Sequence, residues 1–223
     1  MIETELRDVG TQVEFVVRTD VARYQERLPK MGWWPSSAPG TFTRRLDRSA
    51  DVAEIFGRFT SRVELMIQQS LREVAIDWQA GLVEWVGRVQ DSGLRWWLYG
   101  SGALAVRGVD VTPGDLDLHV SDASLAGRLL ADLLVEPVTE LTGWVADRGG
   151  RAWHGVLIEW LSDAHPSGAD PPHEQEPAAG DHLEHVVWRG LTIPVPALAL
   201  QLAVAERRGL PDRAELIRRA MQR

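Results

Sequence analysis

The residues best suited to chemistry stand in segment 115–120, DLDLHV, where acidic and apolar residues alternate. In a strand, this spacing places Asp115 and Asp117 on one face and the apolar residues on the other. Two carboxylates this close raise each other's pKa unless a cation lies between them, and such oxygen ligands favour a hard divalent ion such as Mg²⁺. The segment therefore predicts either a metal site or a half-exposed strand with a solvated acidic face.

A glycine-rich turn precedes these carboxylates. Gly100-Ser101-Gly102 follows the apolar run WWLY at 96–99. Small residues let the backbone approach a ligand closely, and the amides at the start of the helix expected next would point at it. Gly100 and Ser101 are therefore the candidate phosphate-binding residues.

A third carboxylate, Glu159, is the one charge in segment 155–161, GVLIEWL. Burying an unpaired carboxylate is costly, so a function for this residue is expected. Segments 144–146 and 151–161 predict a hairpin that turns at Gly149-Gly150. Such a hairpin would bring Glu159 alongside Asp115 and Asp117.

Together these elements resemble the signature of the DNA polymerase beta-like nucleotidyltransferase superfamily. That signature has a hydrophobic residue, Gly, and Gly or Ser, then a spacer, then Asp, hydrophobic, Asp or Glu, hydrophobic. Here thirteen residues separate Tyr99-Gly100-Ser101 from DLDL at 115–118, and Glu159 fits the third carboxylate on a later strand. The tail, 194–217, is similar to the closing helices of small nucleotidyltransferases, among them drug-modifying enzymes and abortive-infection toxins.

The resemblance implies a reaction and roles for these residues. A nucleoside monophosphate would pass from an NTP to a hydroxyl, with pyrophosphate leaving. Asp115 and Asp117 would hold two Mg²⁺ ions, and Glu159 would share one ion and help to deprotonate the acceptor. Gly100 and Ser101 would bind the outer phosphates. The base and the acceptor stay open: an antibiotic, a tRNA end and a protein hydroxyl are all compatible.

Two positions depart from the pattern of the resemblance. Gln201 stands where many relatives carry a lysine, and Asp110 stands where many have an arginine. Both favour a second hypothesis, a non-catalytic nucleotide-binding or partner-binding module on the same fold. In that case a protein partner would dock on the N-terminal unit or on the long helix predicted below.

A remote alternative is a dinucleotide-binding protein. Segment 100–105, GSGALA, fits G-x-G-x-x-A, and Asp122 follows about 20 residues later, as that fingerprint requires. However, few residues are available for the helix, and carboxylates do not suit a parallel strand that is buried on both faces.

Composition excludes several other kinds of chemistry. The 223 residues include no cysteine, which removes thiolate nucleophiles and disulfides, and Lys30 is the only lysine, which argues against a Schiff base or a P-loop. A net charge of −8 argues against wrapping a long nucleic acid. No signal pattern or membrane-length apolar run is present, so a cytoplasmic location is expected.

The predicted fold class is α/β, a mixed sheet with flanking helices and the site on one edge. We expect an N-terminal β-α-β-α unit at 1–60, a nucleotidyltransferase-like core at 61–195 and closing helices at 196–223. Capping and apolar periodicity predict one long amphipathic helix from Ser61 to near Gly93, and a second helix from Ser121 to Leu134. The Pro-, Gly- and acid-rich segment 162–181 is expected to be a solvated loop.

Overall fold

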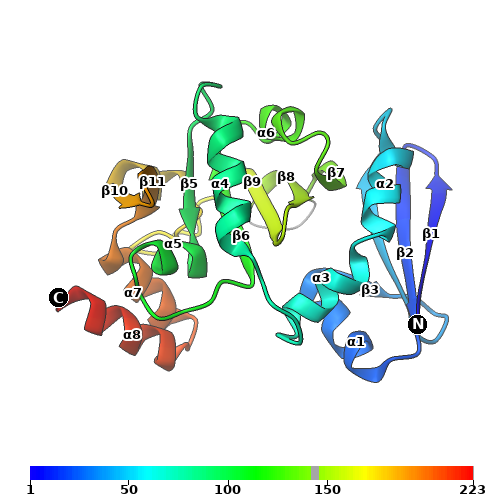
Figure 1. Ribbon diagram of the computed structural model, residues 1–223, viewed down its shortest axis with the longest axis horizontal. Coiled ribbons are helices and arrows are strands. Elements are labelled where there is room, and N and C mark those ends of the chain that lie inside the picture. The colour runs from blue at the N-terminus through cyan, green and yellow to red at the C-terminus, as the bar shows by residue number, and fades with distance from the viewer. Residues whose placement is uncertain (142–145, 223) are drawn as a thin grey trace.

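The computed structural model describes residues 1–141 and 146–222 and contains two sheets and a separate hairpin (Figure 1). The N-terminal sheet has the order β1-β2-β4-β3, from strands β1 (Ile2–Val9), β2 (Gln12–Thr19), β3 (Trp34–Pro35) and β4 (Thr41–Asp47). The central sheet has the order β5-β6-β9-β8-β7, from strands β5 (Trp96–Tyr99), β6 (Asp115–Val120), β7 (Leu134–Glu140), β8 (Ala146–Trp153) and β9 (Leu157–Ala164). Strands β6 and β9 are parallel and the other central pairs are antiparallel, which confirms a mixed sheet.

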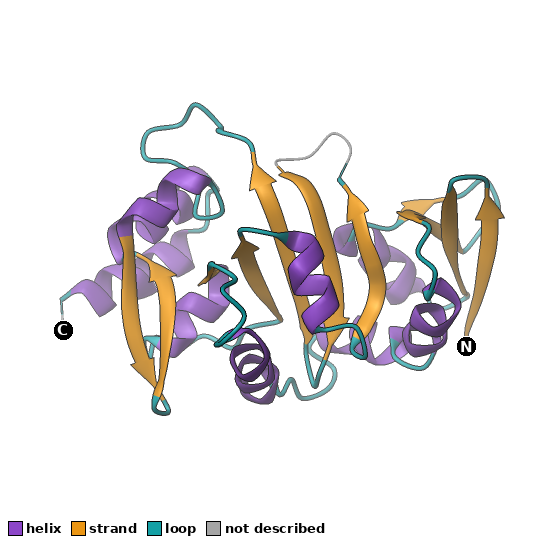
Figure 2. Cartoon of the chain, turned by 90° about the horizontal axis from the view of Figure 1, so that it is seen from above, coloured by secondary structure: helices purple, strands orange, loops and turns teal. Residues whose placement is uncertain are grey.

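Helices pack beside both sheets, and the central sheet lies between the N-terminal sheet and the C-terminal helices (Figure 2). The α-helices are α1 (Ala22–Arg27), α2 (Val52–Thr60), α3 (Val63–Ser70), α4 (Trp78–Val89), α5 (Gly100–Val106), α6 (Ala123–Leu129), α7 (Leu198–Arg207) and α8 (Pro211–Met221). The shorter elements are the 3₁₀ helices η1 (Leu28–Met31) and η2 (Pro177–His182) and the hairpin β10 (Leu183–Trp188) and β11 (Leu191–Pro196).

One face of the central sheet is apolar and packs on α4 and α6. Leu116 and Trp160 point to this face: Leu116 contacts α4 beside Gly81, and the Trp160 indole donates a hydrogen bond to Ala123 O on α6 at 3.1 Å. Side chains alternate along a strand, so residues 115, 117 and 159 must lie on the opposite face. The packing of the apolar face therefore determines where the carboxylates point.

The N-terminal unit begins with a strand that the sequence did not predict. Strand β1 pairs with β2 along its full length, which makes the unit β-β-α-β-β-α rather than β-α-β-α. None of its residues is buried, so the strand lacks the apolar alternation that made β2 and β4 recognisable. One buried cluster nevertheless continues from Phe15 and Phe59 of this unit to Leu116 and Trp160. The division of the chain at residues 60 and 195 stays a prediction.

The single helix predicted from Ser61 to Gly93 is wrong, because the chain breaks between α3 and α4. Arg72 has φ 63°, and Glu73 N–H bonds to Gln68 O at 2.9 Å, which closes the end of α3. Asp77 then caps α4 by accepting a hydrogen bond from Ala80 N–H at 3.0 Å. The apolar periodicity of the sequence continues across the end of α3 and the start of α4, so it does not reveal the break between the two helices.

The hairpin predicted at Gly149-Gly150 is also wrong, since both glycines lie inside β8 and the chain turns after Trp153. Residues 144 and 145 of the predicted first strand fall outside the described residues. A Cβ on Gly150 would lie 2.5 Å from the Trp160 ring, and one on Gly149 would lie 2.8 Å from Trp160 O. These glycines make room for a tryptophan on the next strand and do not form a turn.

Further along the chain, α6 ends at Leu129 rather than Leu134, and strand β7 follows it. Strands β6 and β9 are second and third in the sheet, so the carboxylates lie within the sheet and not on its edge. The hairpin β10-β11 and the helices α7 and α8 agree with the predicted C-terminal elements. Among the described residues, no helix is both long and apolar enough to cross a membrane.

Candidate active site

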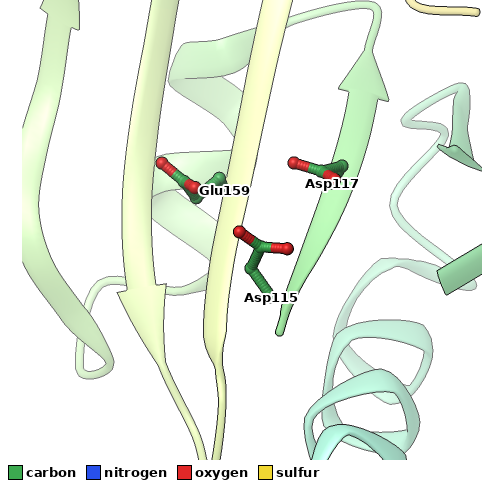
Figure 3. Close-up of side chains that lie close together, drawn as sticks. All are labelled: Asp115, Asp117 and Glu159. Carbon is green, nitrogen blue, oxygen red and sulfur yellow. The ribbon is translucent and has the colours of Figure 1, made fainter. Parts of the chain in front are cut away.

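Three carboxylates from β6 and β9 meet on the polar face of the central sheet. Asp117 lies directly opposite Glu159 in the parallel ladder, and Asp115 is two residues away on the same strand face. Each offers an oxygen, and these oxygens all lie within 4.8 Å of one another; Figure 3 shows the three side chains on the adjacent strands. The structure therefore brings together the carboxylates that the sequence predicted to be close.

The environment of these carboxylates favours a bound cation. Burial, reinforced by the charge of Glu159, raises the pKa of Asp115 to about 6. Burial, followed by the charges of Asp115 and Glu159, raises the pKa of Asp117 well above its usual range. A positive ion between the three groups would relieve this repulsion, and an all-oxygen set suits a hard divalent ion. The residues present thus fit Mg²⁺.

Glu159 belongs to a row of charged side chains that crosses the sheet. Cross-strand neighbours in this row are Asp117, Glu159, Arg151 and Glu136, on β6, β9, β8 and β7. Arg151 donates from Nε to Glu159 Oε1 and from NH1 to Glu136 Oε1, the latter at 3.2 Å. Signs alternate from Glu159 to Glu136, so each neighbour in that part of the row attracts the next.

The row is completed by a residue of the N-terminal sheet. Arg44 on β4 places its Nε 2.8 Å from Glu136 Oε2, so the two oxygens of this carboxylate bind two different arginines. The carbonyl of Met31 accepts a hydrogen bond from Arg151 NH1 at 3.1 Å. Asp117, Glu159, Arg151, Glu136 and Arg44 all border one pocket of about 70 Å³, so the N-terminal unit contributes to the wall of the site.

The glycine turn lies against the side chain of Asp117. Gly100 begins α5 with φ 64°, and a Cβ at this position would lie 2.8 Å from Asp117 Oδ2. Only glycine combines the left-handed conformation with this close approach. Ser101 is partly buried in the first turn of α5, one residue beyond the contact. The turn and the carboxylates are therefore adjacent, as the sequence predicted.

A glutamate from the segment expected to be solvated accepts a hydrogen bond from the backbone of this turn. Gly100 N–H donates to Glu174 Oε2 at 2.9 Å, and Gln201 Nε2 donates to the same oxygen at 2.8 Å. Glu174 is only 6% exposed, and its carbonyl accepts a hydrogen bond from the Trp97 indole at 2.8 Å. The prediction of a solvated loop is therefore wrong around Glu174, and Gln201 does face the glycine turn.

Several residues of the site belong to no recognisable sequence motif. Arg44, Glu136 and Arg151 stand in ordinary strands, and their pairing becomes visible only when β4, β7 and β8 are placed side by side. A charged residue inside a buried strand was the one available signal, since such a charge requires a partner. Glu174 resembled the other acidic residues of its loop.

The structure does not support the dinucleotide-binding alternative. Strands β5 and β6 are antiparallel, whereas that motif requires parallel strands on either side of the helix. Asp122 caps α6 by accepting a hydrogen bond from Leu125 N–H at 2.9 Å, which is a structural role.

Comparison with known proteins gives the fold. TM1012 from Thermotoga maritima, a proposed nucleotidyltransferase, is similar with a TM-score of 0.51 and 19% identity, over 66% of this chain and 93% of that chain. The antibiotic-resistance factor ANT(2'')-Ia has a TM-score of 0.44 and 18% identity, over 66% and 85% of the two chains. The lincosamide antibiotic adenylyltransferase LnuA has a TM-score of 0.41 and 10% identity, over 61% and 94%.

No protein-family model matches the chain, and no curated protein is significantly similar to it in sequence. At 19% identity the likeness to TM1012 bears on architecture, and the mixed sheet with its flanking helices agrees with it. This protein therefore has the fold of the nucleotidyltransferases.

Proposed function

We propose that the protein is a metal-dependent nucleotidyltransferase that moves a nucleoside monophosphate from an NTP to a hydroxyl group and releases pyrophosphate. One observation carries the proposal: Asp115, Asp117 and Glu159 converge within 4.8 Å on a nucleotidyltransferase fold. A structural role alone would not favour two buried carboxylates, Asp115 and Asp117, whose pKa values are raised by burial and by the charge of Glu159.

In this mechanism the three carboxylates divide the work. Asp115 and Asp117 would hold two Mg²⁺ ions, and Glu159 would share one of them. The bound metal would neutralise charge that develops on the phosphates. The acceptor oxygen forms a bond to the α-phosphorus, the bond from that phosphorus to the pyrophosphate oxygen breaks, and Glu159 helps to remove the hydroxyl proton. Gly100 and Ser101 would bind the outer phosphates once Glu174 has left the Gly100 amide.

The acceptor belongs to one of three classes: a small hydroxyl compound such as an antibiotic, the end of a tRNA, or a protein side chain. The pocket beside Glu159 is small, about 70 Å³, and can hold only a small part of any of them. We therefore propose that a single hydroxyl-bearing group enters it while the body of the acceptor remains outside. A panel of the three classes with each radiolabelled NTP would identify the acceptor.

Thermal unfolding with Mg²⁺ and a non-hydrolysable NTP tests the proposal without an acceptor. A ligand that binds only the folded state stabilises it by about 2.7 kcal/mol at 100 times its Kd. We expect this increase for the wild type and a smaller one for Asp115→Asn and Glu159→Gln, with Asp91→Asn as the exposed control. An equal increase in all four proteins would place the metal elsewhere.

One observation favours a second candidate, a non-catalytic module. The carboxylate of Glu174 accepts hydrogen bonds from the Gly100 amide and from the neutral side chain of Gln201. The turn therefore already binds an anionic group of the protein itself. Titration calorimetry with a non-hydrolysable ATP separates the candidates. Metal-dependent binding supports the enzyme, whereas the absence of binding for every NTP supports the module.

A further inference from the structure

Four side chains of alternating charge connect the candidate metal site to the N-terminal unit. They are Arg44 on β4, Glu136 on β7, Arg151 on β8 and Glu159 on β9. The three ion pairs that link these side chains each join opposite charges. Three of the four groups are almost inaccessible to solvent, since the side chains of Arg44, Glu136 and Arg151 are 14%, 2% and 9% exposed.

Arg151 is fixed by contacts in three directions. Its Nε donates to Glu159 Oε1, and its NH1 donates to Glu136 Oε1 at 3.2 Å and to Met31 O at 3.1 Å. Burial opposes its charge, but Glu136 and Glu159 outweigh that effect and raise its pKa above the usual range. A planar guanidinium suits this arrangement because its donors point in fixed directions.

The contact with Arg151 determines what Glu159 can do. Arg151 holds Oε1, which leaves Oε2 as the oxygen available for a metal ion or for the acceptor proton. A glutamate without this contact would rotate about several bonds and lose conformational entropy whenever it bound an ion. Groups that orient metal ligands in this way tune both metal affinity and activity.

The N-terminal unit holds the other side of Arg151. Arg44 binds Glu136 through Nε at 2.8 Å and donates from NH1 to Gly32 O at 3.2 Å. Met31 supplies its carbonyl to Arg151 directly. Arg44 thus reaches the third carboxylate through three successive ion pairs: Arg44–Glu136, Glu136–Arg151 and Arg151–Glu159.

We propose that Arg151 is the positioning residue of Glu159, and that the N-terminal unit completes the site by holding Arg151 through Arg44, Glu136 and the Met31 carbonyl. This inference rests on the proposed function, because it assumes that Glu159 is a metal ligand. It assigns the N-terminal unit a part in the site, where the sequence suggested only a place for a partner to dock.

The principal variant is Arg151→Lys, which keeps the positive charge and so leaves the buried carboxylates compensated. One ammonium cannot reproduce the fixed fork of a guanidinium between Glu159, Glu136 and Met31. We expect Mn²⁺ affinity, measured from the free-ion signal in electron paramagnetic resonance, and kcat each to fall about 10- to 100-fold. Arg88→Gln on α4, which breaks the ion pairs of Arg88 with Glu84 and with Asp132, is the control and should behave as the wild type.

A double-mutant cycle determines whether Arg151 acts through Glu159. In a Glu159→Gln background, Arg151→Lys should no longer change Mn²⁺ affinity, because the group that it positions has lost its charge. Arg44→Gln leaves the Arg151 contact in place and should weaken Mn²⁺ binding less than Arg151→Lys, with a non-additive effect in the double variant. This variant also keeps the test available if substitution of Arg151 prevents folding.

Wild-type Mn²⁺ affinity in Arg151→Lys would overturn the positioning role, because charge alone would then suffice. An effect of Arg151→Lys that persists unchanged with Gln at position 159 would overturn it as well, since Arg151 would then act by another route. These results would leave the proposed function intact if the wild type binds Mn²⁺ and transfers nucleotide. A wild type that does neither would contradict the proposed function and this inference together.

Discussion

Asp117 and Glu159 are opposite one another on parallel strands, and this pairing forms the candidate site from distant parts of the chain. Strand β6 follows the glycine turn, whereas β9 arrives after α6, β7 and β8. The apolar residues Leu118 and Trp160 are paired one residue later in the same ladder. The packing of the apolar face therefore fixes the strand register that places Asp117 opposite Glu159 on the other face.

Replacing one carboxylate should remove activity without loss of stability. In Asp117→Asn we expect no nucleotide transfer and an unchanged or higher midpoint of thermal unfolding in EDTA, because like charges held together for a metal repel one another without it. Differential scanning calorimetry checks the midpoint. A clear decrease in EDTA would mean that the carboxylate has a structural role.

Gly100 should be required for reasons beyond its conformation. Gly100→Ala and Gly93→Ala both place alanine at positive φ, 64° and 76°, at a cost of about 1 kcal/mol each. A Cβ meets Asp117 Oδ2 at 2.8 Å in the first case and nothing within 4 Å in the second. We expect Mn²⁺ affinity to fall only in Gly100→Ala; equal affinities in the two variants would contradict the close contact.

The raised pKa of Asp115 should appear in the pH dependence of stability. Its pKa is about 6 in the folded protein and about 3.9 when unfolded, so the folded state binds more protons between these values. Its contribution to the free energy of unfolding therefore falls as pH rises from about 4 to 6. Buried His119, with its pKa lowered to about 4 by burial, has the opposite sign in this range.

Comparison with Asp115→Asn removes the contribution of His119, which the variant retains, and reports on Asp115 together with its effect on the pKa of Asp117. In EDTA, the variant should become more stable relative to the wild type as pH rises through this range, by about 1 kcal/mol after allowance for solvent screening. Urea unfolding at a series of pH values measures the difference. A constant difference across the range would mean that the pKa of Asp115 is not raised.

Glu174 should oppose the binding of nucleotide. Glu174→Gln keeps an oxygen for the Gly100 amide but removes a negative charge close to the expected phosphates. We expect the Kd of a non-hydrolysable ATP to fall roughly fivefold, or about 1 kcal/mol. The matched control is Glu176→Gln, which replaces another buried glutamate of the segment, one that bonds to His173 N–H. Equal Kd values in the two variants would exclude a specific effect at Gly100.

The parts of the site that the sequence predicted are those encoded by short patterns. Gly100, Asp115 and Asp117 occur within one turn-helix-strand segment, and Glu159 is conspicuous as a lone charge among apolar residues. Strands β5 and β6 were predictable for the same reason, because β5 is a short apolar run and β6 carries apolar alternation, whereas β7 and β8 carry neither pattern. Their roles in metal and phosphate binding stay predictions.

The parts that the sequence could not predict depend on pairing between distant elements. The ion pair of Arg151 with Glu136 depends on the register of β7 and β8, and the place of Glu174 in the site depends on its contact with Gly100. Gly149 and Gly150 resemble a turn in the sequence, but the groups that require glycine there, the carbonyl of Trp160 and its ring, lie on another strand. The break after α3 depends on the left-handed conformation of Arg72, an uncommon choice for arginine.

Crystals soaked with Mn²⁺ and a non-hydrolysable NTP test the metal site most directly, through the anomalous signal of manganese. We expect two peaks about 3.5 to 4 Å apart between Asp115, Asp117 and Glu159, with the nucleotide phosphates bound to both ions. Arg151 should keep its contact with Glu159, and Glu174 should have left the Gly100 amide. Manganese bound elsewhere, or no manganese at these carboxylates with the nucleotide present, would contradict the proposed function.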